Sequence, residues 1–184
     1  MMAIHSNNDQ IRSLISHDGL RDSLTGLMSL PSFLESAERE LSSALRFQRN
    51  LNIFLISLVE VDATGKSQLI VRGGREAFHL TEDELYNLSA RVLEVSKRLI
   101  SDLRTNDLIA RYALADFLIL NSGDHDEITN KLTYIADACG AVAVGLEVVP
   151  KEAVQSRAST KNLHEELRKA IASLERKLLA KLEI

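Results

Sequence analysis

The chain has 184 residues, a hydrophobic share of 45% and a formal net charge of −4, with Cys139 as its only cysteine. This length suits one domain with a sizeable core, and a single cysteine excludes an internal disulfide. The negative charge argues against a general nucleic-acid binder, because neutralising phosphates requires a concentrated excess of Lys and Arg. No apolar run approaches the roughly 20 residues of a membrane span, and residues 1–10 lack the features of a secretory signal. We therefore expect a cytoplasmic protein with no nucleic acid and no membrane among its partners.

The predicted elements begin with a polar tail and a short amphipathic helix over residues 11–20, where three apolar residues have helical spacing: Ile11, Leu14 and Ile15. We assign residues 1–19 to this N-terminal segment and residues 20–184 to a single domain. The N-terminal helix is too short to establish a coiled coil, so the sequence leaves both a monomer and a homodimer open.

A longer helix and a strand come next. Pro31 suits the first turn of a helix, and apolar residues then recur at helical spacing. Residues 51–61 form an apolar, β-branched run that predicts a buried strand. Residues 62–80 contain Gly65 and further glycines among several charges, which predicts an enlarged loop with room for a small hairpin of its own.

The rest of the domain continues this alternation of helices and strands. Thr81 and Glu84 form a capping box that opens a helix reaching about Leu103. A hairpin, a helix, a strand and a final helix are then predicted, at residues 108–120, 126–138, 141–149 and from Asn162 onward. This order of elements predicts an α+β sandwich, in which helices flank a mostly antiparallel central sheet of about five strands.

Three segments of the chain resemble one family. Residues 22–27 (DSLTGL) resemble the DxLTGL motif of GGDEF domains, the diguanylate cyclases. Residues 104–107 (RTND) and the pair Arg111-Tyr112 then follow the order of that family's RxxD and RY motifs. In this register the five signature residues are Ala113, Leu114, Ala115, Asp116 and Phe117. The resemblance covers roughly residues 20–180 and implies a nucleotidyl-cyclase-like, ferredoxin-like sandwich.

The metal-binding positions of that family are replaced in this chain. Joining two GTP molecules requires a divalent metal that neutralises the triphosphate and activates the 3′-hydroxyl, and hard carboxylate oxygens hold such a metal. The resemblance places Ser57 and Val59 at the two strand-end aspartate positions. A register shifted by an insertion would place Glu60 and Asp62 there instead.

The signature run also lacks residues that the family uses for catalysis. Ala113 and Leu114 replace the two glycines that let the backbone approach the nucleotide. Asp116 is the one acid left in the run, and we interpret it as a hairpin-turn residue. From these replacements we predict that the chain is not an enzyme, that it has no magnesium site and that it uses no cofactor.

The Arg104–Asp107 pair is the part of the pattern that is retained. In the family, an RxxD motif before the signature hairpin forms an inhibitory site for cyclic di-GMP. An Arg guanidinium can donate two hydrogen bonds to guanine O6 and N7, and a carboxylate can accept from the N1 and N2 hydrogens. Arg111 could add a positive charge for a phosphate. The alternative interpretation is an exposed ion pair worth at most about 1 kcal/mol.

These observations lead to a first hypothesis with two alternatives. The first is a catalytically inactive GGDEF-like signalling module that binds cyclic di-GMP through Arg104, Asp107 and Arg111 and passes the signal to an unidentified protein partner. The second is a protein-interaction scaffold without nucleotide binding. The third is a domain that binds GTP without turnover.

Overall fold

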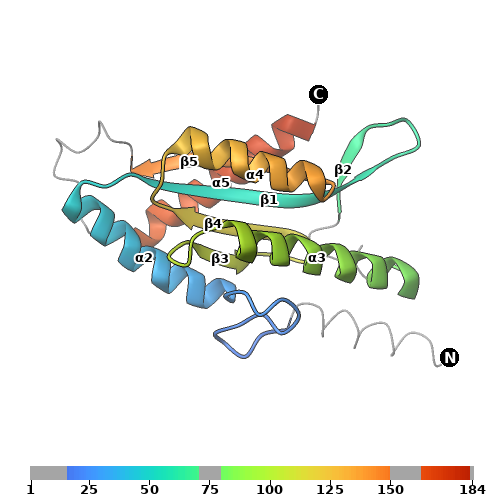
Figure 1. Ribbon diagram of the computed structural model, residues 1–184, viewed down its shortest axis with the longest axis horizontal. Helices are drawn as coiled ribbons and strands as arrows, with labels where there is room; N and C mark the ends of the chain where they lie inside the picture. Colours follow the sequence, from blue (N-terminus) through green and yellow to red (C-terminus); the bar gives the residue numbers. More distant parts are fainter. Residues whose placement is uncertain (1–15, 71–79, 150–162, 183–184) are drawn as a thin grey trace.

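A computed structural model describes residues 16–70, 80–149 and 163–182, and Figure 1 shows a sheet between two layers of helices. The elements follow one another as α2 (Leu30–Phe47), β1 (Leu51–Val61), β2 (Ser67–Leu69), α3 (Glu82–Asp102), β3 (Leu108–Arg111), β4 (Asp116–Asn121), α4 (His125–Ala138), β5 (Ala141–Val149) and α5 (Leu163–Leu182). The predicted α+β sandwich with a five-stranded antiparallel sheet is confirmed.

The sheet is organised around β1. Both β4 and β5 pair with β1 in antiparallel register, and Ser57 lies opposite Asp116 on β4. The last residues of β1, from Val59 to Val61, pair with the short strand β2. The remaining strand, β3, pairs with β4 and completes the sheet.

Each face of the sheet is covered by two helices. Alternate residues of β1, among them Phe54 and Ile56, belong to one buried cluster with α3 and α4. The residues between them, Ile53 and Leu55, belong to a second cluster with α2 and α5. Because both faces are covered, residues 51–59 are buried without the polar alternation of a half-exposed strand.

Local signals in the sequence explain where the helices begin. Ser29 caps α2 by accepting a hydrogen bond from the Ser32 amide, and Pro31 lies in the first turn. The predicted capping box of α3 is present: the Thr81 amide donates to Glu84 Oε2 at 2.7 Å, and the Glu84 amide donates back to the Thr81 hydroxyl at 3.3 Å. The Thr81 hydrogen bonds hold the pKa of the Glu84 carboxyl below its usual range.

The structure differs from the prediction at residues 16–20 and describes only part of the loop predicted over residues 62–80. Residues 16–20 form a loop rather than a helical end, and the rest of the helix predicted over 11–20 lies outside the described residues. In the loop predicted over 62–80, Asp62 accepts hydrogen bonds that close a tight hairpin between β1 and β2, while residues 71–79 lie outside the described part. None of the helices described is long and apolar enough to cross a membrane.

Candidate functional site

A cleft of about 620 Å³ opens between two segments that are distant in sequence. One wall is formed by residues 20–28 and Ser32, and the other by the end of α3 and the start of β3, residues 100–109. Figure 1 shows the first segment, in blue, lying below α3 and beside the start of α2. Buried Leu27 and Leu103 contribute an apolar surface. A concave site of this size, with apolar lining and a few polar groups, is typical of small-molecule binding.

Arg104 and Asp107 both line this cleft, from the turn that joins α3 to β3. The Arg104 amide donates to Asp107 Oδ2 at 2.9 Å, and the Asp107 amide donates to the Arg104 carbonyl at 3.0 Å. The two side chains do not form an ion pair, so the exposed guanidinium of Arg104 is not tied to the carboxylate beside it. Asp107 closes the turn, and Arg104 projects from it.

Asn121 fixes the second oxygen of Asp107. Its Nδ2 donates to Asp107 Oδ1 at 2.5 Å, and its own Oδ1 accepts from the Gly123 amide at 2.5 Å. Asn121 is buried at the end of β4. The cleft carboxylate is therefore anchored to the sheet. Asn121 was not predicted as a site residue; the available signal was a single amide that ends the apolar run of residues 117–120.

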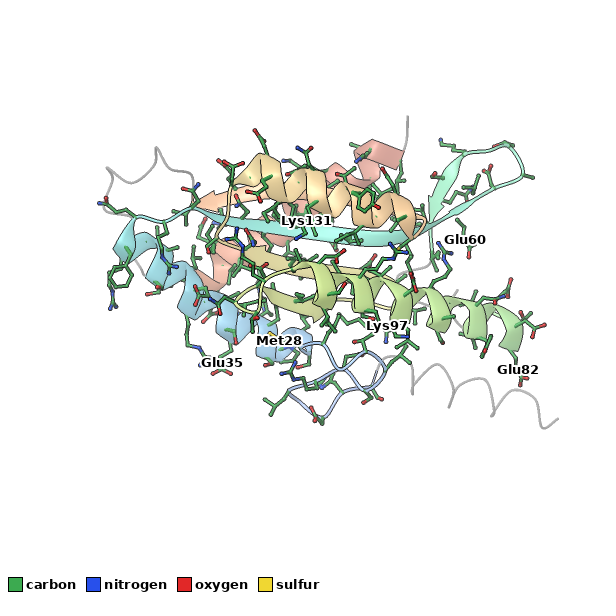
Figure 2. All side chains as sticks on the ribbon, viewed as in Figure 1. Met28, Glu35, Glu60, Glu82, Lys97 and Lys131 are labelled. Atoms are coloured by element: carbon green, nitrogen blue, oxygen red, sulfur yellow. The ribbon has the colours of Figure 1, made fainter. Side chains whose placement is uncertain are left out.

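Lys131 supports the same wall from the neighbouring helix. Its Nζ donates to the Asp102 carbonyl at the end of α3, and Figure 2 labels this lysine on α4. A cation at a helix C-terminus satisfies a carbonyl that has no partner within the helix and complements the helix dipole. The last turn of α3 is thus held immediately before Arg104.

Arg111 does not line this cleft. Its side chain is buried, with Nη1 at 3.3 Å from Asp22 Oδ2 and Nη2 donating to the Leu114 carbonyl at 2.7 Å. Burial lowers the pKa of the Arg111 guanidinium, and the Asp22 carboxylate acts in the opposite direction. The guanidinium expected to contact a phosphate therefore lies in the interior, where it joins the DSLTGL segment to the hairpin between β3 and β4.

The DSLTGL segment folds into a closed turn. Asp22 Oδ1 accepts from the amide and the hydroxyl of Thr25, at 2.8 and 2.7 Å. The Asp22 amide donates to the Leu27 carbonyl at 2.9 Å, and Gly26 has a φ of 69°, which favours glycine. Arg21, just before the turn, donates from Nη1 to the Gly26 carbonyl at 3.1 Å and lines the cleft. The motif therefore builds one wall.

The five signature residues lie at and beyond the turn between β3 and β4. Leu114, Ala115 and Phe117 are buried, while Ala113 is half-buried beside a second cleft of about 320 Å³. Asp116 is the first residue of β4, and its carbonyl accepts from the Tyr112 amide at 2.8 Å, which closes the turn.

The side chain of Asp116 faces β1 rather than solvent, where it accepts a hydrogen bond from the Ser57 hydroxyl. Ser57 stands at one of the strand-end aspartate positions of the resemblance, and Asp116 is the one acid of the signature run. Within the ranges that the structure describes, no three His, Cys, Asp or Glu side chains gather as a metal site would require.

Solved structures with the same arrangement were found by comparison. The GGDEF domain of DgcB from Caulobacter crescentus, in complex with cyclic di-GMP, superposes with a TM-score of 0.59 at 13% identity, over 91% of this chain and 92% of that chain. A diguanylate cyclase protein from Thermotoga maritima gives 0.54 at 15% identity, over 84% and 98%.

The chain has the fold of a GGDEF domain. The resemblance drawn from DSLTGL and RTND is thus confirmed at the level of the fold. A third similar structure, the diguanylate cyclase SiaD of Pseudomonas aeruginosa in complex with its activator SiaC, has a TM-score of 0.55 at 16% identity; the match spans 95% of this chain but 63% of that one. No protein-family model and no curated protein matches the sequence.

The prediction that the chain is not an enzyme is corrected by this comparison. Structures sharing its GGDEF fold include diguanylate cyclases. The prediction gave weight to replacements at single positions, namely Ser57, Ala113 and Leu114. At 15–16% identity most side chains differ between chains that keep one backbone arrangement, so replacements at a few positions do not by themselves establish the loss of a reaction.

Proposed function

We propose that this GGDEF-fold domain is a signalling module that binds cyclic di-GMP in the cleft lined by Arg104 and Asp107. The observation that carries the proposal is that an exposed arginine, Arg104, and a carboxylate, Asp107, line a cleft of about 620 Å³ from one turn. The structurally similar domain of DgcB forms a complex with the same dinucleotide, which supports this choice of ligand.

The chemistry of the two side chains suits a guanine base. Arg104 presents N–H groups that can bond guanine O6 and N7 together. Each oxygen of Asp107 receives one hydrogen bond from the protein, from the Arg104 amide or from Asn121. A carboxylate has about four lone-pair positions, so Asp107 retains capacity for the N1 and N2 hydrogens of guanine. The apolar lining, including Leu103 and Ile109, offers a surface for the face of the base.

A protein partner that reads the bound state is part of the proposal. Leu20 and Ile100 line the cleft with 66% and 57% of their surfaces exposed, which puts apolar side chains beside the ligand. A bound ligand would change the surface that these side chains present. The SiaD structure, with its activator SiaC, is an example of this fold assembled with a protein.

Isothermal titration with cyclic di-GMP tests the proposal. We expect the wild-type protein to bind with a Kd tighter than about 10 μM, and Arg104→Ala to weaken binding at least about tenfold, because it removes charge-assisted hydrogen bonds. The Arg104 side chain makes no hydrogen bond to the described residues, so this variant should keep the stability of the wild type. Arg39→Ala is the matched control, since Arg39 forms an exposed ion pair on α2 with Glu35, which Figure 2 labels.

Two further samples complete the titration. Binding is expected to be equal in magnesium and in EDTA, because the proposed contacts involve protein side chains alone. GTP with magnesium is assayed separately for product, which measures turnover directly. An absence of heat and of a thermal shift with cyclic di-GMP would contradict the proposal and favour an interaction scaffold.

A further inference from the structure

Arg21 is a second arginine that lines the same cleft. It lies on the wall formed by residues 20–28, whereas Arg104 lies on the wall formed by residues 100–109. Arg21 precedes the DSLTGL turn and is exposed. The Asp18 carboxylate accepts from the Arg21 amide at 2.7 Å, and backbone pairing with Met28 holds the other side of the segment. Figure 2 labels Met28 beside this segment. The position of Arg21 is therefore determined by the backbone around it.

The Arg21 side chain is only partly engaged within the protein. One nitrogen, Nη1, donates to the Gly26 carbonyl at 3.1 Å. A guanidinium has five N–H donors, so most of them remain for a ligand. The hydrogen bond to Gly26 restricts the side chain to the cleft side of the turn and reduces the freedom it would lose on binding.

The charges around the cleft indicate what Arg21 would contact. The described lining residues carry two guanidiniums, Arg21 and Arg104, and one carboxylate, Asp107. If Arg104 and Asp107 read a guanine edge, the charge left over is the positive charge of Arg21. A cyclic dinucleotide carries two phosphodiester anions beside its bases, and an arginine is well suited to bind phosphate oxygens.

We propose that Arg21 binds a phosphodiester group of the cyclic dinucleotide, so that base and phosphate are recognised from the two walls of one cleft. This inference rests on the proposed function, and it assigns to Arg21 the phosphate contact that buried Arg111 is not placed to make. It also gives the DSLTGL turn a role in ligand binding in addition to its structural role.

The experiment compares two substitutions at Arg21 by titration with cyclic di-GMP at several sodium chloride concentrations. Arg21→Gln removes the charge while keeping a polar, flexible side chain, and we expect it to weaken binding about tenfold. Arg21→Lys keeps the charge and is expected to stay within about threefold of the wild type. Arg39→Gln is the control and should bind as the wild type does.

The salt series separates a direct contact from support of the turn. Salt screens charge–charge interactions, so the affinity of the wild type should fall as salt rises, and the Arg21→Gln variant should show a shallower dependence. Wild-type affinity in Arg21→Gln, or weaker binding with an unchanged salt dependence, would overturn this inference while leaving the proposed function intact if Arg104→Ala still loses binding. Failure of the wild type to bind cyclic di-GMP would overturn both.

Discussion

Asp22 and Arg111 are separated by 89 positions in the chain and meet in the interior. Their ion pair measures 3.3 Å, with 3% of the Arg111 side chain and 7% of the Asp22 side chain exposed. The guanidinium also donates to the Leu114 carbonyl, so one side chain contacts both the DSLTGL turn and the β3–β4 hairpin. Removing one member of such a pair leaves a buried charge without its partner, which usually destabilises strongly.

We predict that Asp22→Ala lowers the free energy of unfolding by about 3 kcal/mol, because it removes the counter-charge of Arg111 and the hydrogen bonds that close the turn at Thr25. Urea unfolding followed by far-UV circular dichroism measures the change. Glu35→Ala, which breaks an exposed pair with Arg39, should change stability by less than about 1 kcal/mol. Equal losses in the two variants would show that burial of the Asp22 pair is not what makes it important.

The fold could be predicted from the sequence motifs, but the contacts of individual site residues could not. The DSLTGL and RTND segments indicated the correct fold, because motif spacing is a property of the sequence itself. The placement of Arg111 was not predictable in this way: whether a guanidinium is exposed for a phosphate or buried against Asp22 depends on a contact between distant segments. The same holds for Asn121, which acts on Asp107 through the sheet.

At the scale of the elements, α3 illustrates how local chemistry determines a boundary. Its first turn carries Glu82, Asp83 and Glu84, which complement the positive end of the helix dipole. Glu84 and Thr81 satisfy amides that have no partner within the helix. The capping box could be predicted from the sequence because both of its residues lie within four positions of each other.

A pH dependence follows from the lowered pKa of Glu84. Because the folded-state pKa lies below the usual value, the stabilisation is fully present above the ordinary carboxyl range and is lost as pH falls through the lowered value. We therefore expect Glu84→Gln to lower Tm at neutral pH, and the difference from the wild type to shrink below about pH 4.

Thermal unfolding from neutral to acidic pH measures this difference. Glu82→Gln is the control, because Glu82 (labelled in Figure 2) lies in the same turn without bonding Thr81. A constant Tm difference between Glu84→Gln and the wild type across the pH range would contradict the assignment.

Strands with strong signals in their own sequence were predicted correctly, and a strand defined by its pairing with another segment was not. The strands predicted at 51–61 and 141–149 have the bounds of β1 and β5, because apolar β-branched runs ended by polar residues or proline are local signals. The short strand β2 was left within a predicted loop over 62–80, since its pairing with the end of β1 provides most of its definition.

Across the whole molecule, β1 connects the two halves of the core. It pairs along both edges and contributes alternate side chains to the two helical layers. The second layer is tied further by the Tyr112 hydroxyl, which donates to Glu175 on α5 at 2.9 Å, and by Lys177, which donates from α5 to the Gly145 carbonyl of β5. Neither layer has a sheet of its own, so we expect them to unfold together.

This coupling predicts similar consequences for Leu55→Ala and Leu58→Ala. Leu55 belongs to the buried cluster that includes residues of α2 and α5, and Leu58 belongs to the cluster that includes residues of α3 and α4. Each substitution should lower the free energy of unfolding by about 2–5 kcal/mol. Amide hydrogen exchange through global unfolding should accelerate in helices of both layers for either variant. Acceleration confined to α2 and α5 in Leu55→Ala would contradict a single cooperative unit.

The hydrogen bond from Asn121 to Asp107 has a consequence for the entropy of binding. A carboxylate on a free loop must lose rotamers and backbone freedom when a ligand arrives, and that loss weakens binding. Asp107 has already lost this freedom, because folding of the sheet fixes Asn121 and Asn121 fixes the carboxylate. The ordering of this carboxylate therefore accompanies folding, and under the proposed function little of it would be left to occur when cyclic di-GMP binds.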